Sequence, residues 1–173
     1  MDWVSVVLRV LHIGGGILWV GGVATFVLFV QPSAGAVGPA AGPLMRELLG
    51  ARKLVDKFLM FAGVTILAGL VLYVDRWIDA GSFADWVGSG YGLGLTIGML
   101  AALVAVSFGA FGSRPLVGRL LSLQGEIAAS GGPPTPEQQQ TIGAIQGKLK
   151  VYGRTALSLL AVSVITMATA QYW

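Results

Sequence analysis

The chain has 173 residues, of which 55% are hydrophobic and only 11% are charged, and its formal net charge is +3. The length is that of one domain, and the mean hydropathy of +0.78 excludes an ordinary soluble globular domain. The absence of cysteine excludes disulfides, thiolate zinc sites, iron–sulfur clusters and cysteine nucleophiles. No nucleic-acid-binding motif accompanies the positive charge.

Four apolar stretches are each long enough to cross the hydrocarbon core of a bilayer, which needs about 20 residues of helix. We expect transmembrane helices at about residues 4–30, 54–77, 87–113 and 151–172. The predicted fold class is therefore an all-α integral membrane protein, a bundle of four transmembrane helices that forms a single membrane domain over residues 1–173.

The connections differ in character. The segment QPSAGAVGPAAGP (31–43) is rich in Gly, Ala and Pro and is expected to be irregular. The segment 44–61 that follows alternates charged and apolar residues at roughly helical spacing, so we expect it to lie along the membrane interface before the second span.

Leucines continue at helical spacing beyond the third span, through RPLVGRLLSLQGEIAA (114–129). Thr135 is suited to an N-cap, Pro136 to the first helical position and Glu137 to the first turn, so the fourth helix is expected to begin near residue 136. The two extensions together predict a cytoplasmic helical hairpin that lengthens the third and fourth helices.

The basic residues indicate the orientation, because Lys and Arg concentrate in cytoplasmic loops. Nine of the 11 lie in segments 31–57 and 113–154, so both segments are predicted to be cytoplasmic and both termini outside. The nine are Arg46, Arg52, Lys53, Lys57, Arg114, Arg119, Lys148, Lys150 and Arg154, and the other two are Arg9 and Arg76. An aromatic belt is expected at the outer ends, formed by Trp3, Trp77, Trp86, Tyr172 and Trp173.

Many of the 26 glycines fall in the first three predicted helices. In lipid, small residues let helix backbones approach closely, so tight bundle packing is one interpretation. The other is that glycine makes room for a flat cofactor beside the only histidine. The glycines concerned are Gly14, Gly15, Gly16, Gly21, Gly22, Gly63, Gly69, Gly94 and Gly98.

The stretch LRVLHIGGGILWVGG (8–22) places Arg9 and His12, the only histidine, one turn apart in an apolar run. Ionisable groups inside a span are energetically unfavourable, so each is a functional hypothesis. Arg9 lies about 9 Å from Trp3 at 1.5 Å per residue, and its long side chain can extend to the outer surface. His12, about 13 Å from Trp3, is deeper and shorter, so we expect it to face the bundle interior.

A neutral imidazole can ligate heme iron or copper, and Arg9 can neutralise a heme propionate. By depth, Met99 and Met167 are candidate second ligands of a heme, or softer partners for Cu(I). A single histidine excludes a bis-His heme within one chain.

The structural alternative for His12 is a hydrogen bond. The acceptor or donor would be a backbone carbonyl or the hydroxyl of Thr96, Ser163 or Thr166, which lie at similar depth. This alternative and the cofactor hypothesis both remain open at the level of the sequence.

His12, Trp19, Gly21 and Gly22, followed by an apolar run to Gln31-Pro32, resemble the first helix of small membrane proteins of the copper-resistance protein D-like group. That group includes proteins similar to the oxygen-independent bacterial protoporphyrinogen oxidase. The segment MRELLGARKL before the second helix agrees more loosely. The resemblance implies the four-helix architecture, a bacterial-type plasma (inner) membrane location and a heme-contacting His12.

Three classes of function follow. The first is a membrane protein of electron transport that binds heme b or another redox cofactor through His12, with copper as a less expected metal. The second is a non-catalytic accessory subunit of a larger membrane complex, whose glycine-rich helix faces pack against partner proteins or another copy. The third is a small copper or solute permease. The lipid bilayer is the environment in all three, and no nucleic-acid partner is expected.

Overall fold

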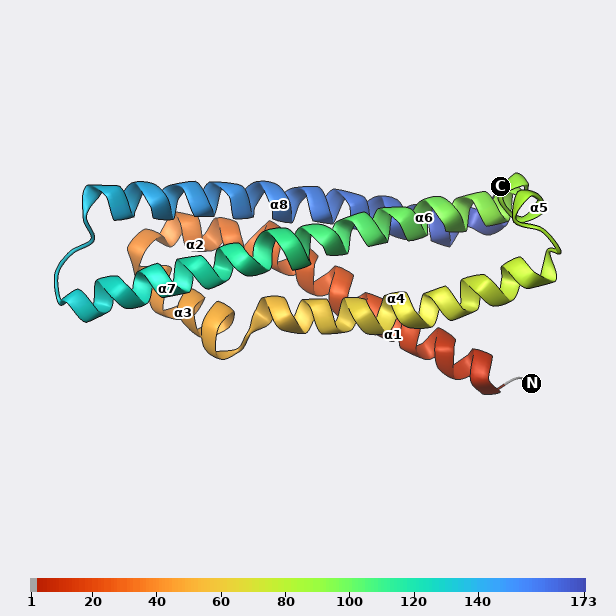
Figure 1. Ribbon diagram of the computed structural model, residues 1–173, viewed down its shortest axis with the longest axis horizontal. Coiled ribbons are helices and arrows are strands. Elements are labelled where there is room, and N and C mark those ends of the chain that lie inside the picture. Colours follow the sequence, from red (N-terminus) through yellow and green to blue (C-terminus); the bar gives the residue numbers. More distant parts are fainter. Residues whose placement is uncertain (1–2) are drawn as a thin grey trace.

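The computed structural model describes residues 3–173, and every regular element within them is a helix. Four helical stretches are long and apolar enough to cross a membrane: Trp3–Ala51, Leu54–Asp79, Gly90–Ser130 and Pro136–Tyr172. The predicted all-α fold with four potential spans is therefore confirmed. Trp3 and the C-terminus lie at the same end of the elongated molecule, and the long connections lie at the other end (Figure 1).

The first stretch contains no irregular segment, so the expectation for residues 31–43 is wrong. Pro32, Pro39 and Pro43 each lie in the first turn of a short helical segment, and their fixed φ is compatible with a helix. Pro39 follows a break in the helical backbone at Gly38 (φ 67°, ψ −138°), so its missing N–H needs no partner. The elements are α1 (Trp3–Thr25), the π-helix η1 (Phe26–Val30), α2 (Gln31–Val37), the 3-10 helix η2 (Gly38–Ala41), α3 (Gly42–Arg46) and the π-helix η3 (Glu47–Ala51).

The second span, α4 (Leu54–Asp79), packs mainly against α1. Close approaches join Gly15 to Thr65 and Gly22 to the ring of Phe58. Because the residue numbers fall along α4 as they rise along α1, the two helices form an antiparallel pair.

The third span begins at Gly90 rather than at residue 87, because a separate helix precedes it. Ser89 is extended (ψ 139°), and its side chain accepts a hydrogen bond from the Gly92 N–H, which caps the longer helix. The elements are α5 (Phe83–Gly88), α6 (Gly90–Ser107), the π-helix η4 (Phe108–Ser113) and α7 (Arg114–Ser130). As predicted, the helix continues past the apolar stretch into residues 114–129.

Trp86 of α5 is only 5% exposed, so the expectation that it belongs to an aromatic belt is wrong. Its ring meets those of Tyr73 and Tyr91 edge-on, at centroid distances of 5.5 Å and 5.7 Å. These ring contacts bury the Trp86 side chain, whereas the other four aromatic residues of the predicted belt are exposed.

The fourth helix, α8 (Pro136–Thr169), begins where the sequence predicts, and the 3-10 helix η5 (Ala170–Tyr172) follows it. Thr135 Oγ1 accepts a hydrogen bond from the Gln138 N–H, and Gln138 Oε1 accepts one from the Thr135 N–H. This reciprocal capping box, with Pro136 and Glu137 in the first turn, explains the sharp start.

α6 and α8 form a second antiparallel pair, in which Gly94 faces Thr166 and the following Ala170 of η5, and Gly98 faces Met167. The two pairs meet in a core to which each long helix contributes one buried residue: Trp19, Ala62, Ala105 and Leu160. A hydrogen bond of 2.7 Å between Tyr73 Oη and Thr96 Oγ1 also joins α4 to α6. The bundle is therefore built from two tightly packed pairs.

Candidate functional site around His12

His12 is hydrogen-bonded to the facing helix. Its Nδ1 lies 2.8 Å from the backbone carbonyl oxygen of Thr65 in α4. A carbonyl oxygen only accepts hydrogen bonds, so Nδ1 carries the ring proton and is the donor of this hydrogen bond. In the neutral imidazole this leaves the lone pair on Nε2, which is the atom available to a metal or to a hydrogen-bond donor.

Nε2 remains accessible. It makes no hydrogen bond within residues 3–173, because the bond of Nδ1 is the only one that the His12 side chain forms there. Buried side-chain polar atoms without a partner in the described chain are limited to Nε1 of Trp86, so Nε2 is not enclosed. The half-buried ring of His12 thus packs one nitrogen against α4 and keeps the other at the surface of the bundle.

Two glycines allow this close contact between α1 and α4. A Cβ atom on Gly69 would lie 2.5 Å from Nδ1 of His12, and one on Gly15 would lie 2.6 Å from Oγ1 of Thr65. Both distances are shorter than real Cβ contacts, so the imidazole can reach the carbonyl only because position 69 lacks a side chain. For these residues the close-packing interpretation of glycine is the one observed, whereas Gly14 and Gly21 have open space beside them.

Arg9 lies one turn nearer the end of α1 that carries Trp3. Its side chain is exposed and forms no hydrogen bond or ion pair within residues 3–173. This position leaves the positive charge available to an anionic group near His12.

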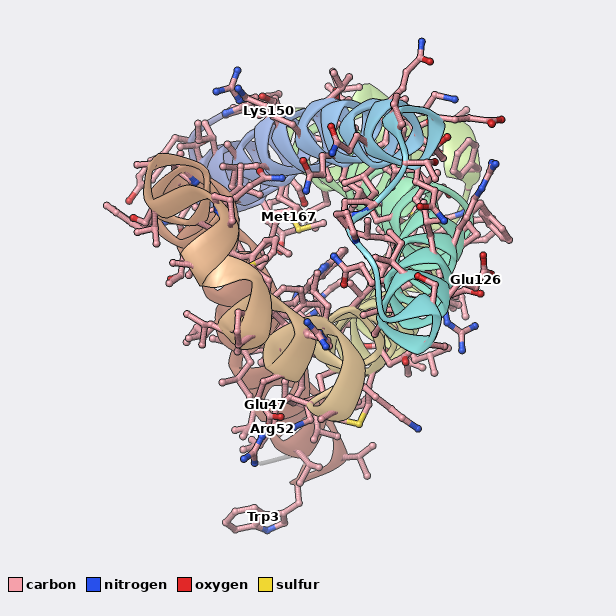
Figure 2. The ribbon with its side chains drawn as sticks, turned by 90° about the vertical axis from the view of Figure 1, so that its left-hand side faces the viewer. Trp3, Glu47, Arg52, Glu126, Lys150 and Met167 are labelled. Carbon is pink, nitrogen blue, oxygen red and sulfur yellow. The ribbon has the colours of Figure 1, made fainter. Side chains whose placement is uncertain are left out.

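Met99 and Met167, the predicted second ligands, lie on the other helix pair. Met167 packs its Cγ against Gly98, and the Ser163 hydroxyl lies 3.9 Å from its Sδ. Figure 2 shows Met167 on the side of α8 that faces the other helices. Met99 is half-buried on α6. The residues that the structure places against His12 are not methionines: the imidazole contacts Thr65 and Gly69 of α4.

The three hydroxyls considered as partners of His12 are occupied elsewhere. Thr96 bonds to Tyr73 and to the carbonyl of Gly92. Thr166 donates to backbone carbonyls within α8, as serine and threonine hydroxyls do in apolar helices, and Ser163 faces Met167. Of the structural alternatives for His12, the backbone carbonyl is therefore the partner observed.

Thr65 is the residue of this site that the sequence does not reveal. Thr65 and Gly69 are four residues apart in an apolar helix, so they lie on the same face of that helix. This spacing is the sequence signal by which the face of α4 that contacts His12 could be found. The partnership with His12 itself spans 53 residues of chain and has no local signature.

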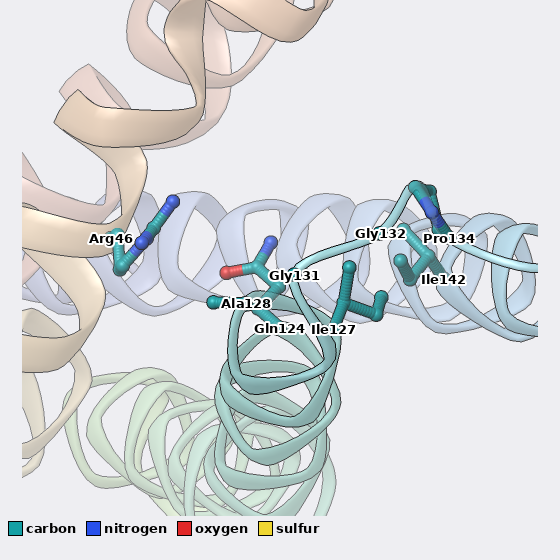
Figure 3. A pocket seen from close by; sticks show the side chains of 8 residues that line it. All are labelled: Arg46, Gln124, Ile127, Ala128, Gly131, Gly132, Pro134 and Ile142. Carbon is teal, nitrogen blue, oxygen red and sulfur yellow. The ribbon is translucent and has the colours of Figure 1, made fainter.

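Two open hollows in the surface of the described chain are both lined by residues other than His12. The larger, about 470 Å³, opens between α3, the end of α7 and the start of α8 (Figure 3). It is lined by Arg46, Gln124, Ile127, Ala128, Gly131, Gly132, Pro134 and Ile142. Among the described residues, no three His, Cys, Asp or Glu side chains cluster in a way that could hold a metal ion.

Comparison with known proteins adds no relative. No family model, no curated protein and no solved structure matches the chain. The functional interpretation therefore depends on the four apolar helices and on the geometry around His12.

Proposed function

We propose that this chain is a multi-pass membrane protein that binds heme b, or another redox cofactor, through Nε2 of His12. The observation that carries the proposal is the hydrogen bond from Nδ1 to the Thr65 carbonyl. A ligating histidine commonly donates its other N–H to such an oxygen, which fixes the tautomer and the ring orientation and raises the basicity of the ligand. His12 has this arrangement without any metal being needed to impose it.

The neighbouring residues fit parts of a heme site. The guanidinium of Arg9, which forms no ion pair within residues 3–173, would hold a propionate, whereas Met99 and Met167, the candidates for a second ligand, lie on the other helix pair. When bound, the heme supplies one-electron transfer. The chain itself orients the imidazole through Thr65 and Gly69 and leaves Nε2 at the surface of the bundle.

The proposed orientation places both termini outside and the α7–α8 hairpin in the cytoplasm. Nine of the 11 basic residues lie in segments 31–57 and 113–154, which supports this choice. The proposed location is a bacterial-type plasma (inner) membrane, as the resemblance of the first helix implies.

An optical spectrum with metal analysis of the gently solubilised protein tests the cofactor proposal. We expect a visible Soret band in the wild type that disappears in His12→Ala, while Arg9→Gln keeps the band with weaker retention of the porphyrin. Met99→Ala and Met167→Ala then identify the second ligand, because only its loss shifts the spectrum. A colourless, helical wild-type preparation with neither porphyrin nor metal would contradict the proposal.

The second candidate is a non-catalytic accessory subunit of a larger membrane complex. It is supported by Gly14, Gly21 and Gly63, beside which a Cβ atom would meet nothing within 4 Å. Such small residues on an open helix face permit close approach by another transmembrane helix. This candidate predicts co-purification with other membrane subunits or with a second copy, and isolation as a lone monomer in mild detergent would count against it.

The third class, a small copper or solute permease, stays a prediction of the sequence, since no contact of the described residues favours it. Altered cellular copper on overexpression would support it, and unchanged copper would remove its basis.

A further inference from the structure

The start of α4 combines unfavourable backbone and electrostatic features, which do not involve His12. The first is the backbone of Lys53, whose φ of 49° is left-handed, a conformation that L side chains rarely adopt. Lys53 is also the N-cap residue, and its side chain makes no capping hydrogen bond. The first N–H groups of α4 therefore lack the side-chain acceptor that usually satisfies them.

The remaining features are electrostatic. Lys53 and Lys57 stand at the positive end of the helix dipole, where cations are unfavourable and anions are stabilised. They are also four residues apart, a spacing at which like charges repel each other. Residues that break several local rules at once are commonly found at functional sites.

The acidic residues nearby do not neutralise these lysines. Glu47 pairs with Arg52 (Oε1 to Nε, 2.8 Å), and the two lie side by side in Figure 2. Asp56 pairs with Arg114 of α7 (Oδ1 to Nε, 2.7 Å). Lys53 and Lys57 form no ion pair within residues 3–173, so four cations face two anions and the cluster has an excess of two positive charges.

A hollow of about 400 Å³ lies among these groups. It is lined by Ala51, Arg52, Lys53, Asp56, Lys57 and Met60. Three basic residues therefore line a space that is open to a ligand, together with Asp56 and with the apolar residues Ala51 and Met60.

An exposed apolar stripe leads away from this hollow along α4. Met60, Val64, Leu67 and Val71 are all exposed and recur every three or four residues after Lys57, so they share one face of the helix. From Met60 to Val71 the stripe is about 16 Å long at 1.5 Å per residue. This length is close to half of the ~30 Å hydrocarbon core of a bilayer, the depth of one leaflet.

We propose that this hollow binds the phosphate headgroup of an anionic phospholipid, whose acyl chain lies along the stripe from Met60 to Val71. A phosphate at this place accepts hydrogen bonds from the uncapped N–H groups and neutralises Lys53 and Lys57. Free phosphate would use only the hollow, whereas a phospholipid uses both the hollow and the stripe. The geometry thus favours a lipid over a soluble anion.

Native mass spectrometry of the full chain in mild detergent, with phosphatidylglycerol and phosphatidylcholine of matched acyl chains in competition, tests the proposal. We compare the wild type with Lys53→Gly/Lys57→Gln, in which glycine suits the left-handed backbone so that folding is preserved. The matched control is Lys148→Gln/Lys150→Gln, which removes two exposed charges from α8 away from the hollow; Figure 2 shows Lys150 on the outward side of that helix.

The wild type and the control are expected to prefer phosphatidylglycerol. The double variant at the hollow is expected to lose about 25-fold of that preference, about fivefold per lysine. If circular dichroism shows that the double variant does not fold, Lys57→Gln alone tests the proposal, with an expected loss of about fivefold in the preference for phosphatidylglycerol. Equal preference in the wild type and the variants would overturn the proposal, as would an equal loss in the control. Displacement of the lipid by an equal concentration of inorganic phosphate would show an anion site without lipid recognition, and would also overturn it.

Discussion

At the scale of single residues, the position of His12 depends on the absence of side chains at two neighbouring glycines. The imidazole reaches the carbonyl of Thr65 because Gly69 presents no side chain, and Gly15 allows the same approach one turn further along α1. The sequence indicates that His12 is unusual, since an ionisable residue in an apolar helix needs a partner. It does not identify Thr65 as that partner, because a backbone carbonyl is present at every position.

The substitution Gly69→Ala tests this packing directly. A Cβ atom at this position would lie 2.5 Å from His12 Nδ1, so the ring or the helix must shift. We expect a loss of about 1–3 kcal/mol in the free energy of unfolding, as for other overpacked sites. The measurement is chemical unfolding in detergent followed by circular dichroism.

Gly63→Ala is the matched control for this prediction, because it lies in the same helix with nothing within 4 Å of the added methyl group. It should leave stability unchanged or raise it by up to about 1 kcal/mol through helix propensity. Equal stability of Gly69→Ala and Gly63→Ala would show that the contact between His12 and α4 does not constrain the fold.

At the scale of elements, the helix boundaries can be predicted from the sequence wherever a capping motif or a long apolar stretch sets them. The capping box at Thr135 and Gln138 places the start of α8 at Pro136, as the sequence predicts. Residues 31–43 are predicted to be irregular because Gly and Pro are common there. They are helical because each proline lies in the first turn of a short helical segment, with which its fixed φ is compatible.

The link between the two helix pairs is testable at this scale. Tyr73→Phe removes the hydrogen bond of 2.7 Å between Tyr73 Oη and Thr96 Oγ1 that joins α4 to α6. We expect a loss of about 0.5–1.5 kcal/mol, measured as a shift in the unfolding midpoint. Tyr91→Phe is the control, since Tyr91 is exposed and its hydroxyl makes no hydrogen bond within residues 3–173. A loss of similar size in both variants would show that the hydrogen bond to Thr96 adds nothing beyond the general effect of removing a tyrosine hydroxyl.

At the scale of the whole molecule, the structure divides the bundle into the α1–α4 and α6–α8 pairs, joined by the core of Trp19, Ala62, Ala105 and Leu160. The long helical connections lie at one end and both Trp3 and the C-terminus at the other (Figure 1). This arrangement is independent of the direction in which the molecule crosses a membrane. The distribution of Lys and Arg supports one direction.

The proposed orientation predicts the accessibility of single cysteines. The chain has no cysteine, so Ala84→Cys in α5 and Ala129→Cys in α7 each introduce one thiol at an exposed position. A membrane-impermeant maleimide applied to intact cells should label position 84 and not position 129, and permeabilised cells should show labelling at both. The reverse pattern in intact cells would mean that the hairpin lies outside.

The sequence alone determined the features that depend on local composition: four apolar helices, the continuation of the third helix beyond its apolar stretch, and the start of the fourth at its cap. Hydropathy, helix length and capping act over a few residues, so a single chain reveals them. Only the tertiary structure decided that Trp86 is buried, that the Thr65 carbonyl accepts a hydrogen bond from His12, and that the acids near Lys53 and Lys57 are already paired. Most of these contacts join residues far apart in the sequence, and they form because small residues let the helices approach closely.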